Sequence, residues 1–224
     1  PYPAAVPPIN TFRVKAPLVA KIASRKRLVG PKAPGEVCQV DIHTGGDFAY
    51  LEGQSLGIVP PGSHAETGKP HAVRLYSIAS TRYGETLRGD SVSLCVRRAV
   101  YTDPETSVED PAKKGIASNF LCDALPGDEV KLTGPMGKVM MLPEATPASD
   151  LIMVATGTGI APYRGFLRRL FVERGSPYGR DFTGLAWLFL GVANTDALLY
   201  DDDWQAIKAE RPDRFRVDYA ISRE

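Results

Sequence analysis

Residues 151–162 read LIMVATGTGIAP, and this stretch decides the fold of the second half of the chain. The run 151–155 is continuously apolar, which is typical of a strand buried on both faces of a parallel sheet. A glycine-rich turn follows, and then Pro162 opens a stretch to Phe171 that favours a helix, because proline is common in the first helical turn. The stretch therefore predicts a strand, a tight turn and a helix in succession.

The rest of the second half repeats this pattern. The apolar run at 185–191 predicts a second buried strand, residues 215–221 are expected to form a third strand, and a helix is expected through residues 202–207. Strands that alternate with helices predict a parallel, doubly wound α/β sheet. The sequence stops at Glu224, directly after the last strand, and it begins with a proline-rich lead that has no initiator Met. We therefore expect a trimmed start and a truncated α/β domain.

The first half follows a different pattern, in which short β-type runs alternate with turn residues. Such spacing predicts an antiparallel barrel or sandwich. One short helix is expected at 118–122, with Ser118 as its N-cap. We place the boundary near Pro147, with a barrel domain at 1–147 and the first part of an α/β domain at 148–224. The predicted strands are 36–42, 55–59, 73–78, 91–96 and 129–132.

Composition narrows the classes of function. The 224 residues carry a formal net charge of +1, which gives no general attraction to nucleic acid. No apolar run is long enough to span a bilayer. The three cysteines (Cys38, Cys95, Cys122) are irregularly spaced, which favours a reducing compartment over a disulfide framework. Neither they nor the three histidines show metal-ligand spacing, and no Gly-x-Ser-x-Gly nucleophile motif is present.

The glycine-rich turn at 155–162 is the strongest local signal. Small residues between a buried strand and a helix let a backbone approach an anion such as a pyrophosphate. The turn is neither a Walker motif nor the dinucleotide fingerprint Gly-x-Gly-x-x-Gly. A tight turn that needs glycine only for its backbone angles explains it equally well.

Four other segments have side chains suited to a nucleotide. Arg74 and Tyr76 share one face of a predicted strand, where they could hold a phosphate and a flat ring. Arg97 and Tyr101 offer a similar pair, and 115–119 could form an anion nest. Each has a plainer explanation in solvent exposure or in helix capping by Ser118. Ser222-Arg223 follows the third parallel strand, where an arginine favours the 2′-phosphate of NADP unless the pair only begins a surface loop.

The order of these segments is more specific than any one of them. RLYSIAS, SLCVRRAVY, KKGIASNFL, TGPMGK, ATGTGIAP, GLAWLFLGVAN and ISRE follow one another as in plant-type ferredoxin–NADP(+) reductases, which the chain resembles from about Asn10 to Glu224. The resemblance implies an FAD-binding antiparallel barrel before an NADP-binding α/β domain. The phrases LVGPKAPGE and CVRRAVYTDPET are most similar to the root-type, non-photosynthetic plastid isoform.

The resemblance implies roles for individual residues. The strand RLYS would hold FAD, with the tyrosine stacked on the isoalloxazine and the serine, the implied catalytic residue, near flavin N5. A second strand would line the flavin, and its arginine would reach the NADP pyrophosphate. The implied FAD residues are Arg74, Leu75, Tyr76, Ser77, Cys95, Val96, Arg97, Tyr101 (at the adenine) and Ile116, Ala117 and Ser118 (at the pyrophosphate). The implied NADP residues are Thr158, shared with FAD, Val192, Ala193, Ser222 and Arg223.

Two departures from the family pattern stand out. Ala117 occupies a position where many members have cysteine, and because that segment works through its backbone we expect little loss. The C-terminal segment of the family, with its catalytic Glu and terminal Tyr, is absent from the 224 residues. We therefore expect FAD binding but an incomplete hydride-transfer site.

The resemblance also implies a partner and a location. Ferredoxin is acidic in this family, so exposed basic residues should guide it to the flavin edge. The candidates are Arg13, Lys15, Lys69 and Lys138. The implied location is a plastid, at the stroma or the thylakoid periphery, with a bacterial cytoplasm as the alternative. Two other functions stay open: an NADPH-dependent reductase for flavodoxin or an oxygenase, and a non-catalytic barrel that docks a partner.

Overall fold

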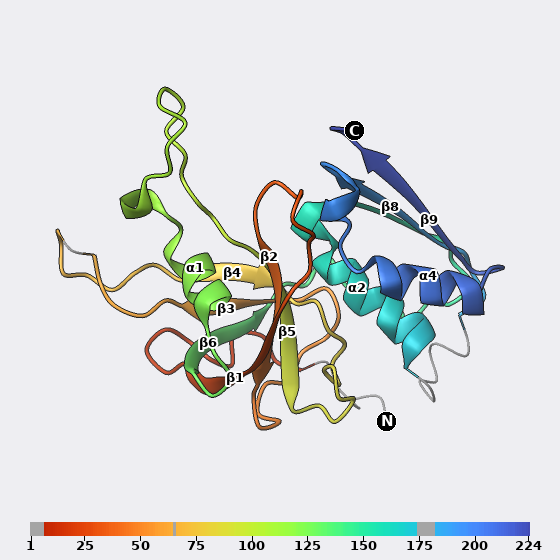
Figure 1. Ribbon diagram of the computed structural model, residues 1–224. Helices are drawn as coiled ribbons and strands as arrows, with labels where there is room; N and C mark the ends of the chain where they lie inside the picture. Colours follow the sequence, from red (N-terminus) through yellow and green to blue (C-terminus); the bar gives the residue numbers. More distant parts are fainter. Residues whose placement is uncertain (1–6, 65, 174–181) are drawn as a thin grey trace.

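The computed structural model describes residues 7–64, 66–173 and 182–224 (Figure 1). The first six residues of the proline-rich lead therefore lie outside the described residues. Two bodies lie side by side, an antiparallel barrel formed by the first half of the chain and an α/β body formed by the second half (Figure 1).

Six antiparallel strands build the barrel, in the order β4-β3-β6-β1-β2-β5. An isolated bridge between Ile78 and Leu94 joins the two ends of the sheet and closes it. β2 shows why the sequence adopts this form, since every second side chain is buried in the barrel core. The strands are β1 (Leu18–Arg27), β2 (Val37–His43), β3 (Ser55–Val59), β4 (Arg74–Ser77), β5 (Ser91–Arg97) and β6 (Glu129–Met136). The predicted antiparallel barrel is confirmed.

Two local expectations in the barrel were wrong. β1 was not predicted, because only Ala20 and Ile22 of its ten residues are buried and its outer side chains are largely basic. The short helix α1 (Ile116–Asp123) starts earlier than expected, and its N-cap is Gly115 rather than Ser118. The Ser118 hydroxyl instead accepts a hydrogen bond from the N–H of Ala99 at 3.1 Å and donates one to the Gly115 carbonyl at 3.3 Å.

The α/β body contains the parallel sheet β7-β8-β9, as the strand and helix pattern predicted. β7 leads through a 3-10 turn (Gly157–Ile160) into α2, which continues as a π-helical turn (Arg168–Val172). Both helices lie on the side of the sheet that faces the barrel (Figure 1). The elements are β7 (Leu151–Thr156), α2 (Ala161–Leu167), β8 (Ala186–Val192), α4 (Asp201–Glu210) and β9 (Phe215–Ile221).

The far face of this sheet differs from expectation. The continuous apolar run of β7 predicted burial on both faces, yet Ile152 is 71% exposed and Val154 is 66% exposed. Met153 and Ala155 point to the opposite face and are buried beneath α2 and α4. None of the described segments covers Ile152 and Val154, so β7 is buried on one face only in this chain.

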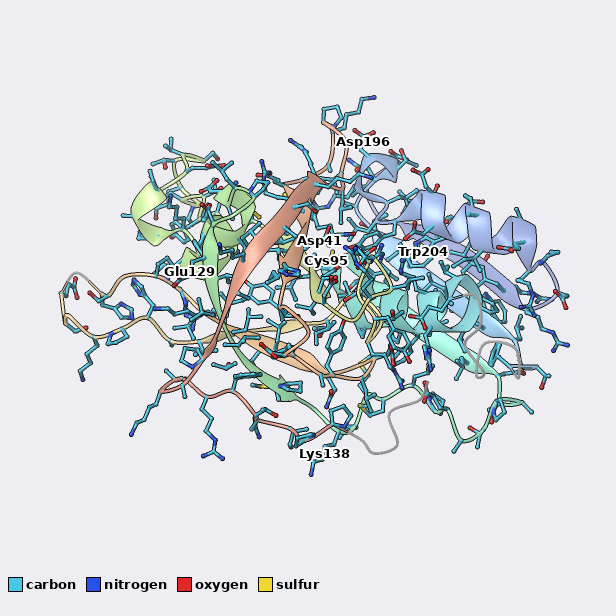
Figure 2. All side chains as sticks on the ribbon, turned by 90° about the horizontal axis from the view of Figure 1, so that it is seen from below. Asp41, Cys95, Glu129, Lys138, Asp196 and Trp204 are labelled. Carbon is cyan, nitrogen blue, oxygen red and sulfur yellow. The ribbon has the colours of Figure 1, made fainter. Side chains whose placement is uncertain are left out.

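A continuous core and buried ion pairs join the two bodies. Ala79 and Cys95 of the barrel belong to the same hydrophobic cluster as the residues beneath the parallel sheet, and Cys95 lies between the bodies in Figure 2. Arg164 of α2, with a side chain only 5% exposed, pairs with Glu85 of the barrel at 2.6 Å. Such contacts fix how the bodies sit against each other. No helix in the described ranges is long and apolar enough to cross a membrane.

Candidate functional site

A cavity of about 460 Å³ lies where the carboxyl ends of the parallel strands meet the barrel. This is the edge at which open α/β sheets bind nucleotides. The strand ends contribute Thr156, Gly157, Thr158, Gly191, Val192, Ala193, Ala220, Ser222 and Arg223, and the barrel contributes Val29, Ala33, Pro34, Gly35, Val37 and Arg97.

The strand ends are shaped by close backbone contacts. Gly157 has a φ of 50°, in the left-handed region where a residue with a Cβ would be strained. A Cβ on Gly191 would lie 3.2 Å from the Thr156 side chain, so glycine keeps β8 close to the turn after β7. Gly157 and Thr158 also line the cavity. The two explanations of the glycine-rich turn, a tight turn that needs glycine and a turn that faces a ligand, are therefore compatible.

The chain beyond β9 places one cation at this cavity. The N–H of Arg223 donates to the Ala193 carbonyl at 2.8 Å, and the N–H of Ser222 donates to the Val192 carbonyl at 3.1 Å. Glu224 turns away, because its carboxylate accepts hydrogen bonds from the N–H and hydroxyl of Thr195 at 3.1 and 2.8 Å. The Arg223 guanidinium has no hydrogen bond or ion pair within the described part of the chain, and so it is available to an anion.

Arg97 approaches the cavity from the barrel, at the end of β5, where its guanidinium donates to the Pro34 carbonyl at 3.3 Å. The structure thus brings together six predicted residues from four segments: Arg97, Thr158, Val192, Ala193, Ser222 and Arg223. Sequence reasoning missed the barrel segment 29–37, although its Pro34-Gly35 turn, with a φ of 105° at Gly35, was a readable signal.

A second, smaller cavity of about 30 Å³ lies across the barrel beside α1. It is lined by Pro60, His64, His71, Ala72, Arg74, Ile116 and Ala117. The His64 and His71 rings lie 4.6 Å apart between centroids, and Nδ1 of His71 is buried without a hydrogen-bond partner in residues 7–64, 66–173 and 182–224. The first-turn N–H groups of α1 have no intrahelical acceptor. Polar groups from three segments therefore converge here, and sequence reasoning missed the two histidines.

Tyr76 follows Arg74, which lines this cavity, by two residues on β4. Its ring is half-buried and packs against the core cluster, while the flanking Leu75 and Ser77 side chains are exposed. Burial raises the pKa of Tyr76 to about 12, so the phenol stays protonated at neutral pH. Arg74 is exposed and makes only weak contacts with the carbonyls of Ala72 and Val73, at 3.3 and 3.5 Å.

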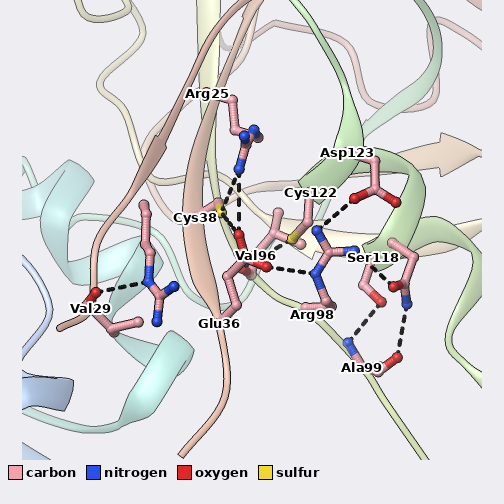
Figure 3. Close-up of polar contacts among 12 residues, drawn as sticks. Arg25, Val29, Glu36, Cys38, Val96, Arg98, Ala99, Ser118, Cys122 and Asp123 are labelled. Atoms are coloured by element: carbon pink, nitrogen blue, oxygen red, sulfur yellow. Dashed lines mark hydrogen bonds and ion pairs between the residues drawn. The ribbon is translucent and has the colours of Figure 1, made fainter. Parts of the chain in front are cut away.

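Tyr101 lines a third cavity, of about 340 Å³, between α1 and the hairpin 102–110. The Lys113 ammonium lies 4.6 Å from the ring centroid, and so it covers one face of the ring. The neighbouring Arg98 has a structural role, since it binds Glu36 at 2.6 Å, Asp123 at 2.7 Å and Asn119 at 2.9 Å (Figure 3). These contacts tie β2, β5 and α1 together.

Five predicted cofactor residues are buried: Cys95, Val96, Ala117, Ser118 and Val192. Val96 is fully buried in the barrel core, and its carbonyl faces the Cys122 thiol at 3.9 Å (Figure 3). Any contact made by Val96 with a ligand would therefore use its backbone. Cys95 and Ser118 are 6% and 8% exposed. Burial raises the pKa of the Cys95 thiol to about 12, so this thiol stays protonated.

The four basic candidates for partner binding are exposed and come from three segments. Hydrogen bonds from Asn10 to the Pro135 carbonyl and from Phe12 to the Gly134 carbonyl hold the N-terminal segment beside the end of β6. Arg13 and Lys15 therefore share a region with the segment leading to Lys138, which is labelled in Figure 2. Lys69 lies on the separate loop between β3 and β4.

Comparisons with known proteins agree with this geometry. The model of the oxidoreductase NAD-binding domain family matches residues 153–224. A chloroplastic root isozyme of ferredoxin–NADP reductase from Oryza sativa subsp. japonica is 59% identical over 219 residues, which are 97% of this chain and 57% of that protein. A solved ferredoxin–NADP+ reductase from Plasmodium falciparum with 2′P-AMP has a TM-score of 0.78 and 30% identity, and it matches 95% of this chain and 75% of its own. The chain belongs to the ferredoxin–NADP(+) reductase family.

Within this family the root isozymes are more similar to the chain than a leaf isozyme is. Root isozyme 2 of Arabidopsis thaliana is 58% identical over 219 residues, whereas leaf isozyme 1 of Oryza sativa subsp. indica is 47% identical over 215 residues; they cover 97% and 96% of this chain and 57% of each relative. The chain spans about 57% of the length of these curated ferredoxin–NADP reductases.

Proposed function

We propose that this chain binds FAD and NADP(H) and serves in electron exchange between ferredoxin, in one-electron steps, and NADP(H), by hydride transfer. The observation that carries the proposal is the cavity at the ends of β7, β8 and β9, where the Arg223 guanidinium, without a partner among the described residues, faces residues of the barrel. The solved Plasmodium reductase was obtained with 2′P-AMP, which carries the phosphate that distinguishes NADP from NAD.

The NADP(H) site in this proposal is the 460 Å³ cavity. Ser222 and Arg223 bind the 2′-phosphate, since an arginine at this strand end accommodates that group. Arg97 reaches the pyrophosphate from the barrel side, and Thr158, Val192 and Ala193 contact the nucleotide along the strand ends. Glu224 does not oppose the phosphate, because its carboxylate is bound to Thr195.

The FAD site in this proposal lies on the barrel, and the residues present fit it. Arg74 and the first-turn amides at Ile116, Ala117 and Ser118 supply donors for a diphosphate, and the His71 ring lies beside them. Leu75 and Tyr76 hold the isoalloxazine from β4, with Cys95 and Val96 on the β5 side, while Tyr101 offers its free face to the adenine. A bound flavin supplies both one-electron and hydride chemistry.

Ser77 is the proposed catalytic residue. Its exposed position at the end of β4, directly after Tyr76, leaves the hydroxyl free to hydrogen-bond at flavin N5. The neutral phenol of Tyr76 provides a planar surface without adding charge to the site. We also propose that the two bodies are separate domains, a barrel of residues 1–147 and the first part of an NADP-binding domain at 148–224.

The proposed partner is ferredoxin, and the proposed location is a plastid, as for the chloroplastic relatives. Arg13, Lys15, Lys69 and Lys138 would attract an acidic protein through long-range electrostatics, which salt screens within about 8–10 Å at physiological ionic strength. Electron transfer to ferredoxin should therefore fall steeply with added salt. Faster turnover with flavodoxin than with ferredoxin would instead favour a different acceptor.

The visible absorption spectrum of the purified chain tests the flavin part of this proposal. We expect the spectrum of oxidised flavin and about one FAD per chain after reconstitution, as for any single specific site. The double variant Arg74→Ala/Tyr76→Ala should lose this spectrum, whereas Arg88→Ala, which removes an exposed arginine paired with Asp90, should keep it. A colourless chain that added FAD does not restore would contradict the proposal and favour a flavin-free docking barrel.

A further inference from the structure

The loop between β1 and β2, residues 28–35, belongs to the barrel in sequence but reaches the α/β body (Figure 1). Its Val29, Ala33, Pro34 and Gly35 line the nucleotide cavity opposite the strand ends. We propose that this loop is a wall of the NADP(H) site and that Asn194 and Asp196 are positioning residues that hold it in place. The inference rests on the proposed function of that cavity.

Three hydrogen bonds attach the loop to the α/β body. The Asp196 carboxylate accepts the N–H of Lys32 at 2.7 Å, and the Asp196 carbonyl accepts the N–H of Gly30 at 2.8 Å. The Asn194 side-chain amide donates to the Lys32 carbonyl at 2.7 Å. Asp196 lies at the edge of the molecule where the two bodies meet (Figure 2). Because all three bonds join Gly30 and Lys32 to the short segment 194–196, they set the position of the loop as a unit.

Gly30 permits this close approach. A Cβ at this position would lie 2.5 Å from Oδ2 of Asp196 and 2.8 Å from its Cγ. Alanine would therefore force the carboxylate to move, and with it the acceptor of the Lys32 N–H. The contact can thus be disturbed from either body, by changing Asp196 or by changing Gly30.

The loop is also held from the barrel side. The Arg97 guanidinium donates to the Pro34 carbonyl at 3.3 Å. Gly30 and Lys32, which are bound to the α/β body, lie between the cavity-lining residues Val29 and Ala33. The lining residues are apolar or glycine, so the wall adds shape and excludes water, while Arg97 and Arg223 provide the charge for phosphates.

The segment 194–196 also connects the wall to the chain end that carries Arg223, the residue proposed for the 2′-phosphate. Glu224, next to Arg223, binds the N–H and hydroxyl of Thr195, which lies between Asn194 and Asp196. The segment 194–196 therefore contacts the barrel loop on one side and the chain end beyond β9 on the other. Loss of the Asp196 contact should weaken binding of the dinucleotide, because the wall would shift although every proposed phosphate ligand would remain.

Hydrogen–deuterium exchange and equilibrium titration of the full 224-residue chain with bound FAD, using NADP+ as the probe, test the inference together. In the unmodified chain NADP+ should slow exchange in peptides covering 28–35. Asp196→Ala should speed that exchange without nucleotide and raise the Kd for NADP+ about tenfold, the effect of losing about 1.4 kcal/mol. Gly30→Ala should likewise speed exchange and raise the Kd. Asp196→Asn, which keeps one acceptor oxygen, should change both quantities less.

Asp213→Ala is the matched control, since Asp213 is an exposed acid of the α/β body, 67% exposed and paired with the adjacent Arg214. It should leave both readouts unchanged. If NADP+ binds but exchange in 28–35 does not respond, or if Asp196→Ala and Gly30→Ala bind like Asp213→Ala, the inference is wrong and the proposed function stands. If NADP+ does not bind the unmodified chain, the proposed function fails and the inference fails with it.

Discussion

At the scale of single residues, the position of a side chain decides whether it can contact a ligand or instead stabilises the fold. Arg97 and Arg98 are neighbours in sequence, yet Arg97 lines the nucleotide cavity while Arg98 is bound to Glu36, Asn119 and Asp123. Likewise, the Ser118 hydroxyl hydrogen-bonds the N–H of Ala99 and the Gly115 carbonyl. A hydroxyl that the protein already uses contributes little to a ligand, so the exposed Ser77 is the better candidate for chemistry at the flavin.

Ser77→Ala tests this assignment. The variant should keep its flavin spectrum, because Arg74 and Tyr76 are unchanged. It should slow reduction of the bound flavin by NADPH about tenfold, the effect of losing one interaction of about 1.4 kcal/mol in the transition state. Stopped-flow absorbance measures the rate, and Ser63→Ala, in the exposed loop after β3, is the control. Equal rates for the two variants would rule out a role for the Ser77 hydroxyl.

At the scale of elements, β7 shows how far periodicity can be read from a sequence. Its apolar run predicted a parallel strand correctly, because parallel strands of α/β sheets are usually covered on both faces. The exposure of Ile152 and Val154 was not readable, since the sequence of a strand does not say which segment packs on each face. β1 was missed for the opposite reason, because only two of its side chains are buried and its outer face is charged.

The two faces of β7 should respond differently to truncation. Met153→Ala removes a side chain that is 2% exposed beneath the helices, and it should cost about 2–5 kcal/mol of unfolding free energy. Val154→Ala, on the exposed face, should cost less than about 1 kcal/mol, as surface changes do. Urea unfolding of this chain measures both. Similar losses for the two variants would contradict the one-sided burial.

At the scale of the whole molecule, the site exists only because the two bodies are held together. The cavity takes residues from both, and the order of motifs in the sequence predicted the strand-end half of it. The contacts of Asn194 and Asp196 with the barrel wall could not be predicted, since they join residues 162 and 164 positions apart without a periodic signal. The buried pair of Arg164 and Glu85 likewise depends on the packing of two separate segments.

Acid should weaken this junction. Burial alone would raise the pKa of Glu85, but the Arg164 guanidinium hydrogen-bonds the carboxylate and holds its pKa below the ordinary value. A lowered folded-state pKa stabilises the fold above the unfolded-state value of about 4.3, and this stabilisation is lost as pH falls through the folded-state pKa. Glu85→Gln should therefore be less stable at pH 7 and lose less stability between pH 5 and 3. Urea midpoints against pH measure this.

Glu105→Gln, in the exposed hairpin, is the control for that experiment and should follow the unmodified chain. An unchanged pH dependence in Glu85→Gln would show that the pair does not contribute to acid unfolding. The buried Arg164 would in that case be satisfied by its other partners, the Asp203 carboxylate at 3.2 Å and the Ala79 carbonyl at 3.1 Å.

The central claim is that the cavity at the ends of the parallel strands binds NADP(H) through Arg223. Calorimetric titration with 2′-phospho-AMP and with AMP tests it most directly. The unmodified chain should prefer 2′-phospho-AMP, and Arg223→Ala should reduce that affinity about 10- to 100-fold, the effect of losing charge-assisted hydrogen bonds of about 1.5–3 kcal/mol, while AMP binding changes little. Arg214→Ala should match the unmodified chain. Equal affinity of the unmodified chain for the two nucleotides would contradict the account.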